Sequence, residues 1–407
     1  MFRPASIALS AAAALLLAPR DAQAAYSLTK DYSGDNFFAE GSWNWYGKLT
    51  LPSLLAEACN YDNLTNGDII FVNQSDSSDI AYINSAGNAI IKVDNTSTVP
   101  YNEKRRSVRI QSQDEYPIGS MWVFDFLHVP YGCSVWPAAW SQAAQWPQGG
   151  EIDSFEGVNL QTANQYALHT TSGCTADASS SANPFTGNLT YDNCDKNVNS
   201  NSGCSIIDRS TASYGEEFAA AGGGVWATEM GKDGIKIWFF SRADVPSDLL
   251  TSNSSAVPDP STWGEPAASY GSSCDIPQYF APQHLVLDIT ACGDWAGQVT
   301  NSTGCPLTTD LCYTSFVLDS TNFQNAYFEI PSIRVYYDAD KAADSAASTT
   351  ATTTASGSAS SATTSAKSGS SASSGSNTTS GAAQLGGVMN GVVGAAMAVA
   401  VGAWTLA

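Results

Sequence analysis

The chain is poor in basic residues. Its 407 residues include 17 lysines and arginines against 38 aspartates and glutamates, so the formal net charge is −21. Because contact with phosphates requires a basic surface, we expect no nucleic-acid partner. A neutral polysaccharide is not repelled by this charge, and a strongly acidic surface favours solubility outside the cell.

Histidines and paired cysteine motifs are also scarce. The sequence has three histidines and no Cys-x-x-Cys pair, which disfavours a structural zinc site. We therefore expect no metal ion at a functional site and no cofactor. A structural calcium stays an open alternative, because no motif in the sequence argues for or against it.

The nine cysteines indicate an oxidising compartment. Cys59 and Cys133 stand alone, whereas the other seven form two groups, 174–204 and 274–312. We expect disulfides that staple loops within each group. The odd number leaves at least one thiol that is free or paired between molecules.

The N-terminus has the features of a secretory signal. Arg3 gives the positive start, residues 7–17 form an apolar stretch, and Ala22-Gln23-Ala24 supplies a small-residue cleavage site. This stretch is too short for a convincing membrane span. We predict that residues 1–24 are a signal peptide, that the protein is secreted, and that a catalytic domain follows over 25–340.

The composition changes sharply after residue 340. Residues 343–383 are almost entirely Ser, Thr, Ala and Gly, so we predict a disordered, O-glycosylated stalk over 341–383. Residues 384–407 end the chain with an apolar stretch that is typical of a glycosylphosphatidylinositol (GPI) signal, which is removed. Asn377, Ser380 or Gly381 would then carry the anchor at the cell surface. The alternative is a transmembrane helix, for which a basic flank is missing.

Short strand-like runs dominate the region between these ends. No long segment has a helical period, and the one candidate for a short helix is 51–59. The runs are rich in Val, Ile and aromatic residues, several of them alternate, and turn residues separate them. They predict an all-β sandwich or jelly roll, with strands over 89–93, 106–112, 120–126, 165–170, 234–240, 285–290 and 327–337.

An acidic run interrupts this pattern at residues 151–156. On a β-strand Glu151 and Asp153 share a face, whereas Glu156 has the wrong parity for a regular strand. One extra residue in a β-bulge would return Glu156 to that face, and bulges are frequent beside active sites. We therefore predict a bulge near Ser154–Phe155, on a strand whose acidic face is concave.

Three carboxylates on one face favour glycosidic-bond chemistry. Crowded carboxylates cannot all ionise cheaply, so one pKa rises and one proton stays. An ionised nucleophile and a protonated acid are what a retaining glycosidase needs. The alternative is an acidic edge strand that blocks aggregation. That alternative does not explain Trp136, Trp140 and Trp146 beside the acids.

At these residues the sequence resembles glycoside hydrolase family 16, in its fungal laminarinase-like branch. The family signature Glu-x-Asp-x-x-Glu is matched by residues 151–156. The resemblance covers roughly residues 26–340 and includes several motifs in the family's order, namely Trp-Pro-Gln-Gly-Gly at 146–150, Gly-Val-Asn at 157–159, and the segments 105–109, 164–170 and 222–227.

The resemblance implies a concanavalin A-like β-jelly roll and endo-hydrolysis of β-1,3 or mixed β-1,3/1,4 glucan. It assigns Glu151 as the nucleophile, Glu156 as the acid/base and Asp153 as the residue that orients the nucleophile. Two alternatives stay open. One is a transglycosylase that uses the same carboxylates, and the other is a non-catalytic glucan-binding surface protein. We expect a monomer.

Further residues are candidates for substrate contact. His169 follows the signature and is expected to act near the nucleophile from a neighbouring strand. Trp140 and Trp146 are expected to stack on sugars, whereas Trp122, Trp238, His128 and His284 are expected to be structural. The remaining substrate-binding candidates are Arg106, Asn159, Trp226 and Glu229, the last two because a glycine triplet at 222–224 precedes them.

Overall fold

A computed structural model describes residues 26–47, 62–179, 183–250 and 256–342. The expected signal peptide, the candidate helix at 51–59, the stalk and the anchor signal all lie outside these residues. The described part belongs to one compact unit within Met1–Ala346. No helix among the described residues is long and apolar enough to cross a membrane.

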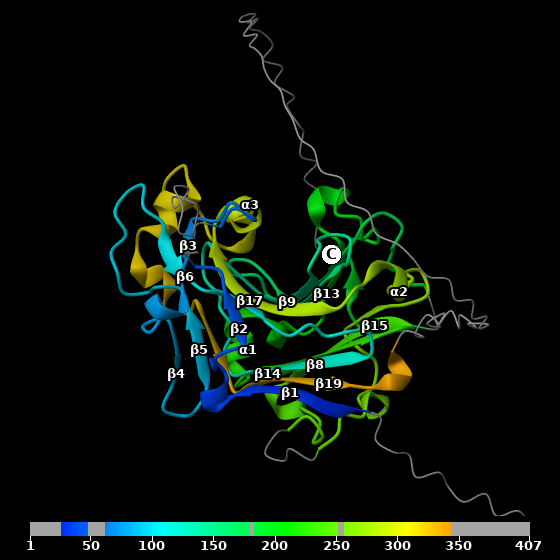
Figure 1. Cartoon of the computed structure of the whole chain (residues 1–407). Coiled ribbons are helices and arrows are strands. Elements are labelled where there is room, and N and C mark those ends of the chain that lie inside the picture. The colour runs from blue at the N-terminus through cyan, green and yellow to red at the C-terminus, as the bar shows by residue number, and fades with distance from the viewer. Residues whose placement is uncertain (1–25, 48–61, 180–182, 251–255, 343–407) are drawn as a thin grey trace, which may run out of the picture. The chain divides into compact units, whose positions relative to one another are not determined.

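Two antiparallel sheets stack face to face, which confirms the predicted all-β sandwich (Figure 1). The first sheet has the strand order β1 (Ser27–Ser33), β19 (Ser332–Tyr337), β8 (Ser120–Phe126), β14 (Gly224–Gly231), β15 (Gly234–Ser241), β16 (Ala268–Tyr270). The second has the order β12 (Asn188–Leu189), β13 (Cys204–Ile207), β11 (Gln165–His169), β10 (Glu151–Glu156), β9 (Val135–Ala143), β17 (Gln283–Ala291), β7 (Arg109–Ser112), β2 (Trp43–Trp45).

Smaller elements lie around the sandwich. One small sheet has the order β18 (Tyr327–Ile330), β5 (Ala89–Lys92), β4 (Ala81–Ile83), and a parallel pair joins β3 (Ile69–Phe71) to β6 (Arg105–Ser107). The α-helices of the described residues are short: α1 (Gly215–Ala220), α2 (Ile276–Tyr279) and α3 (Gly293–Ala296). Single turns of 3-10 or π helix occur in the loops.

The core lies between the two large sheets because their inner faces are apolar. Strand β8 sends Trp122, Phe124 and Phe126 into this core, whereas its Met121 and Val123 join a second cluster on the outer face of the six-stranded sheet. Trp122 and Trp238 are both buried, as predicted. The six-stranded sheet therefore has apolar clusters on both faces. The outer face of the eight-stranded sheet carries the acidic run.

Two predicted strands are divided in the structure. The run 106–112 breaks at Val108, where the chain passes from β6, paired with β3, to β7, paired with β17. The run 327–337 breaks at Pro331, where the chain leaves the small sheet of β18 and enters the large sheet as β19. Proline has no N–H for a ladder, so it separates strands.

Four disulfides close the described loops. Cys194–Cys204 and Cys292–Cys312 lie within the expected groups, but Cys174–Cys274 joins the two groups and Cys133–Cys305 ties the isolated Cys133 to the second group. The prediction of purely local pairing is therefore wrong for half of the bonds, because the sandwich brings together loops that are far apart in the sequence. The ninth cysteine, Cys59, lies outside the described residues.

Candidate active site

The acidic run forms β10, in the middle of the eight-stranded sheet. Its neighbour β9 is regular, and Gln142, Trp140 and Ala138, at every second position of β9, lie on one face. These three residues pair with Glu151, Asp153 and Glu156 in turn. The register shifts by one residue between Asp153 and Phe155. The predicted bulge is therefore confirmed, and all three acids share the outer face of the sheet.

The inner face of β10 shows why the bulge is tolerated. Ile152, Ser154 and Phe155 are all fully buried, so two consecutive side chains turn toward the core. The ring of Phe155 packs against Phe126 and Trp226. Burial of this ring compensates for the irregular backbone. The eight-stranded sheet also curves away from its partner sheet, which makes the acidic face concave as expected (Figure 1).

A glycine fixes where β10 begins. Gly150 has a φ of +73°, a conformation that L side chains rarely adopt. A Cβ at this position would also lie 2.4 Å from the ring of Phe280. The glycine that precedes Glu151 in the sequence therefore allows the chain to enter the strand against an aromatic ring.

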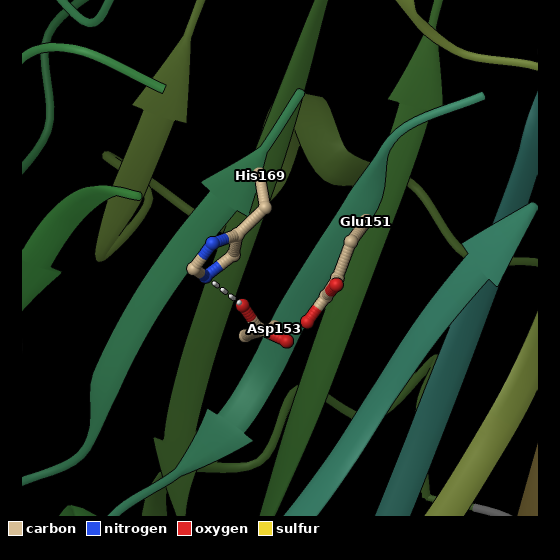
Figure 2. Close-up of side chains that lie close together, drawn as sticks. All are labelled: Glu151, Asp153 and His169. Carbon is tan, nitrogen blue, oxygen red and sulfur yellow. Dashed lines mark ion pairs between the residues drawn. The ribbon is translucent and has the colours of Figure 1, made fainter. Parts of the chain in front are cut away.

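Each carboxylate on the concave face has its own partner. The indole Nε1–H of Trp146 donates to Glu151, and that of Trp136 donates to Glu156 at 2.8 Å. Between them, Asp153 faces His169, whose Nε2 lies 3.3 Å from Asp153 Oδ2. Figure 2 shows Glu151 and Asp153 on one strand and His169 reaching toward them from the neighbouring strand β11. The predicted approach of His169 is confirmed.

Burial raises the pKa values of both outer carboxyls. For Glu151 burial and then the charge of Asp153 raise the pKa to about 8, against the opposing effects of His169, Trp146 and Arg109. For Glu156 burial and then Asp153 raise the pKa well above its usual range, and Trp136 and His169 oppose them. Asp153 is thus a common cause of both shifts, and the three acids titrate as a group.

His169 is a cation in this setting. Burial opposes its charge, but Glu151 and Asp153 outweigh that effect and raise the pKa of His169 to about 10. Its second nitrogen, Nδ1, lies 3.1 Å from Asn201 Oδ1, so both ring nitrogens face acceptors. Ligand atoms of Glu151, Asp153 and His169 lie within 4.8 Å of one another. His169 faces Asp153 with Nε2 and Asn201 with Nδ1, so either nitrogen could bind a metal ion only after losing its proton.

An arginine and an aspartate extend the concave face on the other side of β9. Asp288 accepts a hydrogen bond from Trp140 Nε1 at 2.9 Å and pairs with Arg109 at 3.3 Å. The guanidinium of Arg109 lies 4.6 Å from the ring centre of Tyr46 and 5.1 Å from that of Trp140. Trp140 is 9% exposed and Trp146 is 38% exposed, so Trp146 is the more accessible platform.

Two predicted contacts lie away from the carboxylates. Arg106 pairs with Asp79 at 2.7 Å on β6, outside the large sheets. The basic residue of the site is Arg109 instead, because the break at Val108 sends the two arginines to different sheets. Asn159 is fully buried, and its side chain binds the backbone of Ser134 and Ala296. It therefore holds a loop and is not available to a hydroxyl of the substrate.

Trp226 and Glu229, which follow the glycine triplet, also lie away from the predicted site. Trp226 is fully buried in the core between the sheets, and Glu229 on the outer face of the six-stranded sheet accepts a hydrogen bond from Tyr26 at 2.7 Å. A Cβ at Gly223 would lie 2.3 Å from Phe126 O. The close backbone approach that the glycines indicate is real, but it is between β14 and β8 and not at the acidic face.

Sequence reasoning left several residues of the site without a role. The sequence places Trp136 only near the acids, whereas in the structure its indole N–H donates to Glu156. Arg109 and Asp288 are 179 positions apart in the sequence and meet only because β7 pairs with β17. Their charge within an apolar strand pattern was the available signal, since buried charges are usually paired.

Two carboxyls on one concave face of a β-sandwich are the pair of groups that glycoside hydrolysis requires. The model of the XgeA-like catalytic domain of glycoside hydrolase family 16 matches residues 58–336. This chain belongs to glycoside hydrolase family 16. The predicted family and jelly-roll fold are therefore confirmed.

Two relatives illustrate the extent of the similarity. A probable glycosidase of Schizosaccharomyces pombe is 36% identical over 316 residues, which is 76% of this chain and 69% of the relative. A probable endo-1,3(4)-β-glucanase of Neosartorya fischeri is 36% identical over 346 residues, which is 83% of this chain and 49% of the relative. The match thus spans about half the length of the second protein.

Two solved structures are similar over nearly their whole length. Laminarinase 16A of Phanerochaete chrysosporium, solved with two β-glucans in donor and acceptor sites, has a TM-score of 0.67 at 34% identity and is matched over 76% of this chain and 99% of its own. An elongating family 16 β-1,3-glucosyltransferase has a TM-score of 0.66 at 33% identity, with the same coverage of both chains. The described fold is therefore shared by a hydrolase and a transferase.

Proposed function

We propose that the protein is a retaining endo-β-glucanase that hydrolyses β-1,3 or mixed β-1,3/1,4 glucan. The observation that carries this proposal is the bulge in β10, which returns Glu156 to the face of Glu151. Two carboxylates on one concave face can act on the two sides of one glycosidic bond. The glucanases and laminarinase among the similar proteins support the choice of β-glucan as substrate.

In the first step Glu151 attacks the anomeric carbon. The bond from this carbon to the glycosidic oxygen breaks, and Glu156 gives its proton to that oxygen. The match of residues 151–156 to the family signature supports these roles. The tryptophan N–H groups hold both carboxyls in place, and both side chains are only half-buried, so a polymer can reach them.

In the second step a water molecule attacks the anomeric carbon and displaces the carboxylate of Glu151. Glu156, now a carboxylate, takes a proton from this water, and the ester bond to Glu151 breaks. Asp153 and His169 form an ion pair in the middle of the site. We expect Asp153 to orient Glu151 and to keep a proton on Glu156 through its negative charge, and His169 to hold Asp153.

The direct test is incubation of the protein with laminarin, lichenan and cellulose, with the products resolved by size. We expect oligosaccharides from laminarin or lichenan and none from cellulose. Glu151→Gln and Glu156→Gln should each lose most of the activity. The proposal is wrong if pure protein changes no β-glucan. A glucan-binding surface protein is the reading that remains if Glu151→Gln leaves every measured property unchanged.

Transglycosylation is a second candidate, since the similar glucosyltransferase shares the fold. The chemistry differs only in the second step, where a sugar hydroxyl gives its proton to Glu156 in place of water. The same incubation separates the two activities at high substrate concentration. Products longer than the starting oligosaccharide would indicate transfer, and only shorter products would indicate hydrolysis.

For its location, we propose secretion followed by lipid anchoring at the cell surface. The signal-like N-terminus and the apolar C-terminal residues 384–407 support this proposal. Asn63, Asn188 and Asn301 each begin an Asn-x-Ser/Thr motif for N-glycosylation and are exposed, so we expect them to carry glycans. Release of the protein from intact cells by a phosphatidylinositol-specific phospholipase would support the anchor, and retention after that treatment together with a C-terminal tag still present would contradict it.

A further inference from the structure

Asn164, in the loop before β11, binds the bulge of β10 with both ends of its side chain. Its Oδ1 accepts a hydrogen bond from the backbone N–H of Glu156 at 2.9 Å, and its Nδ2 donates to Ser154 O at 3.0 Å. Asn164 is fully buried. The one amide therefore spans the inserted residue of the strand and ends at the backbone of the proposed acid/base.

The contacts replace a missing part of the β-ladder. Among the described strands, β11 pairs with β10 only over Glu151–Asp153, where Asp153 faces Ala167. The pairing of β10 with β11 ends at Asp153, where the bulge begins. The side-chain amide of Asn164 offers an N–H donor and a C=O acceptor to the bulge, as a peptide unit would, and supplies the partners that the ladder no longer provides.

The backbone of Asn164 is itself held on both sides. Its N–H donates to Ser213 Oγ at 2.9 Å, and its C=O accepts from the N–H of Asp208 at 2.9 Å. Ser213 Oγ in turn donates to Ser210 O at 2.6 Å. The amide therefore projects from a fixed point, and any shift of Asn164 would be passed to the backbone of Glu156.

We propose that Asn164 is a positioning residue that sets the place of the acid/base Glu156 relative to the glycosidic oxygen. It does not contact Glu151, whose side chain is held by Trp146. The proposal rests on the proposed function, because it assigns to Asn164 the placement of a group that acts in proton transfer. Its loss should impair proton transfer selectively and leave nucleophilic attack largely unchanged.

The test compares two substrates in Asn164→Ala. Laminarin needs a proton on its leaving oxygen, whereas 2,4-dinitrophenyl β-laminaribioside releases a phenolate that needs none. Glu151 forms the ester in both cases, and the electron pair of the broken C–O bond stays on the departing oxygen. We expect laminarin turnover to fall about 100-fold, the order of loss for a misplaced general acid. The initial burst of dinitrophenolate should stay within a few-fold of the wild type.

Asn164→Asp gives a second test that keeps the shape of the side chain. A protonated carboxyl can still donate to Ser154 O, but an ionised one cannot and also places a negative charge beside the bulge. As the pH is raised, we expect the laminarin activity of this variant to be lost at a lower pH than that of the wild type. The dinitrophenolate burst should show no such change. This readout remains valid if Asn164→Ala does not fold.

Gln161→Ala is the matched control, because Gln161 Oε1 accepts the backbone N–H of Val158 at 2.9 Å in the same loop but does not contact the bulge. It should behave as the wild type on both substrates. An equal fall on both substrates in the Asn164 variants, or no fall on either, would overturn the positioning role. Wild-type protein that changes neither laminarin nor any other β-glucan would instead contradict the proposed function itself.

Discussion

Asp153 occupies the centre of the acidic face and is 2% exposed. Burial is the largest cause of the raised pKa values of Glu151 and Glu156, and the charge of Asp153 is the second for both. One buried carboxylate thus acts on the two carboxyls that are proposed to react. This arrangement makes the pH dependence of activity a property of the group and not of one residue.

Replacing Asp153 by asparagine should move the pH profile. Without the negative charge both pKa values fall, so the two limbs of the kcat/KM profile shift to lower pH by about one unit, and turnover also falls. The opposite control is His169→Gln, since His169 lowers both pKa values and its loss should shift the limbs upward. Steady-state kinetics from pH 3 to 9 measures this, and an unmoved profile in Asp153→Asn would contradict the role of its charge.

Glu151 should reduce the stability of the folded protein at neutral pH. Its folded pKa is about 8 against an ordinary value of 4.5, so the folded state keeps a proton that the unfolded chain releases between these pH values. The free energy of unfolding therefore falls as pH rises through this window. Glu151→Gln, which does not titrate, should gain stability relative to the wild type from pH 4.5 to 8. Urea unfolding at pH 4, 6 and 8 tests this, and a constant difference would refute it.

The positions of some single residues could be predicted from the sequence, and those of others could not. The parity of Glu156 was enough to predict the bulge, because a strand has a strict period of two. Arg106 and Asn159 were misplaced for physical reasons that the sequence hides. A break at Val108 decides which arginine enters the large sheet, and only the folded loop shows that Asn159 already satisfies the backbone of Ser134.

At the scale of elements, the bulged strand β10 depends on a polar contact within the core. Ser154 Oγ accepts the indole N–H of Trp122 at 3.1 Å and lies 2.8 Å from Thr228 Oγ1, and all three residues are fully buried. These bonds join the middle strands of the two sheets. They also fix the face on which the inserted residue lies.

Ser154→Ala should therefore destabilise the protein. The loss of the hydroxyl leaves Trp122 and Thr228 with fewer partners in the core, which costs about 1–3 kcal/mol. Ser205→Ala is a matched control, because Ser205 Oγ is buried but has no hydrogen-bond partner. Chemical denaturation of both variants measures the difference. Equal losses in the two serine variants would contradict the structural role of Ser154.

Strands were predictable as runs, but their partners were not. The run 120–126 is a strand with the predicted ends, since its apolar residues and flanking turns mark it. The run 327–337 predicts one strand, but in the structure Pro331 divides it between two sheets. Pairing depends on contacts between segments far apart in the chain, and no local pattern carries that information.

At the scale of the whole molecule, the disulfides join distant loops of the sandwich. Cys174–Cys274 closes a separation of 100 residues, whereas Cys194–Cys204 closes 10. Cysteine spacing alone allowed many pairings, so the crossing bonds could not be predicted. The all-β class and the carboxylate pair could be predicted, because composition, strand runs and the signature agree.

Loop length predicts how much each bond contributes. Replacing both cysteines of the Cys174–Cys274 pair by alanine should cost about 2 kcal/mol more than replacing those of the Cys194–Cys204 pair, since the longer loop restricts the unfolded chain more. Thermal unfolding of the two double variants measures this. A larger loss for the short loop would show that local strain or packing outweighs chain entropy.

The central claim is that Glu151 forms a bond to the sugar while Glu156 moves the proton. The most direct measurement uses a 2-deoxy-2-fluoro laminaribiosyl fluoride, which slows the second step and lets the covalent intermediate accumulate. Peptide mass spectrometry should then find one glycosyl group on Glu151. A label on Glu156 or Asp153, or an active enzyme that inverts the anomeric configuration of its products, would contradict the account.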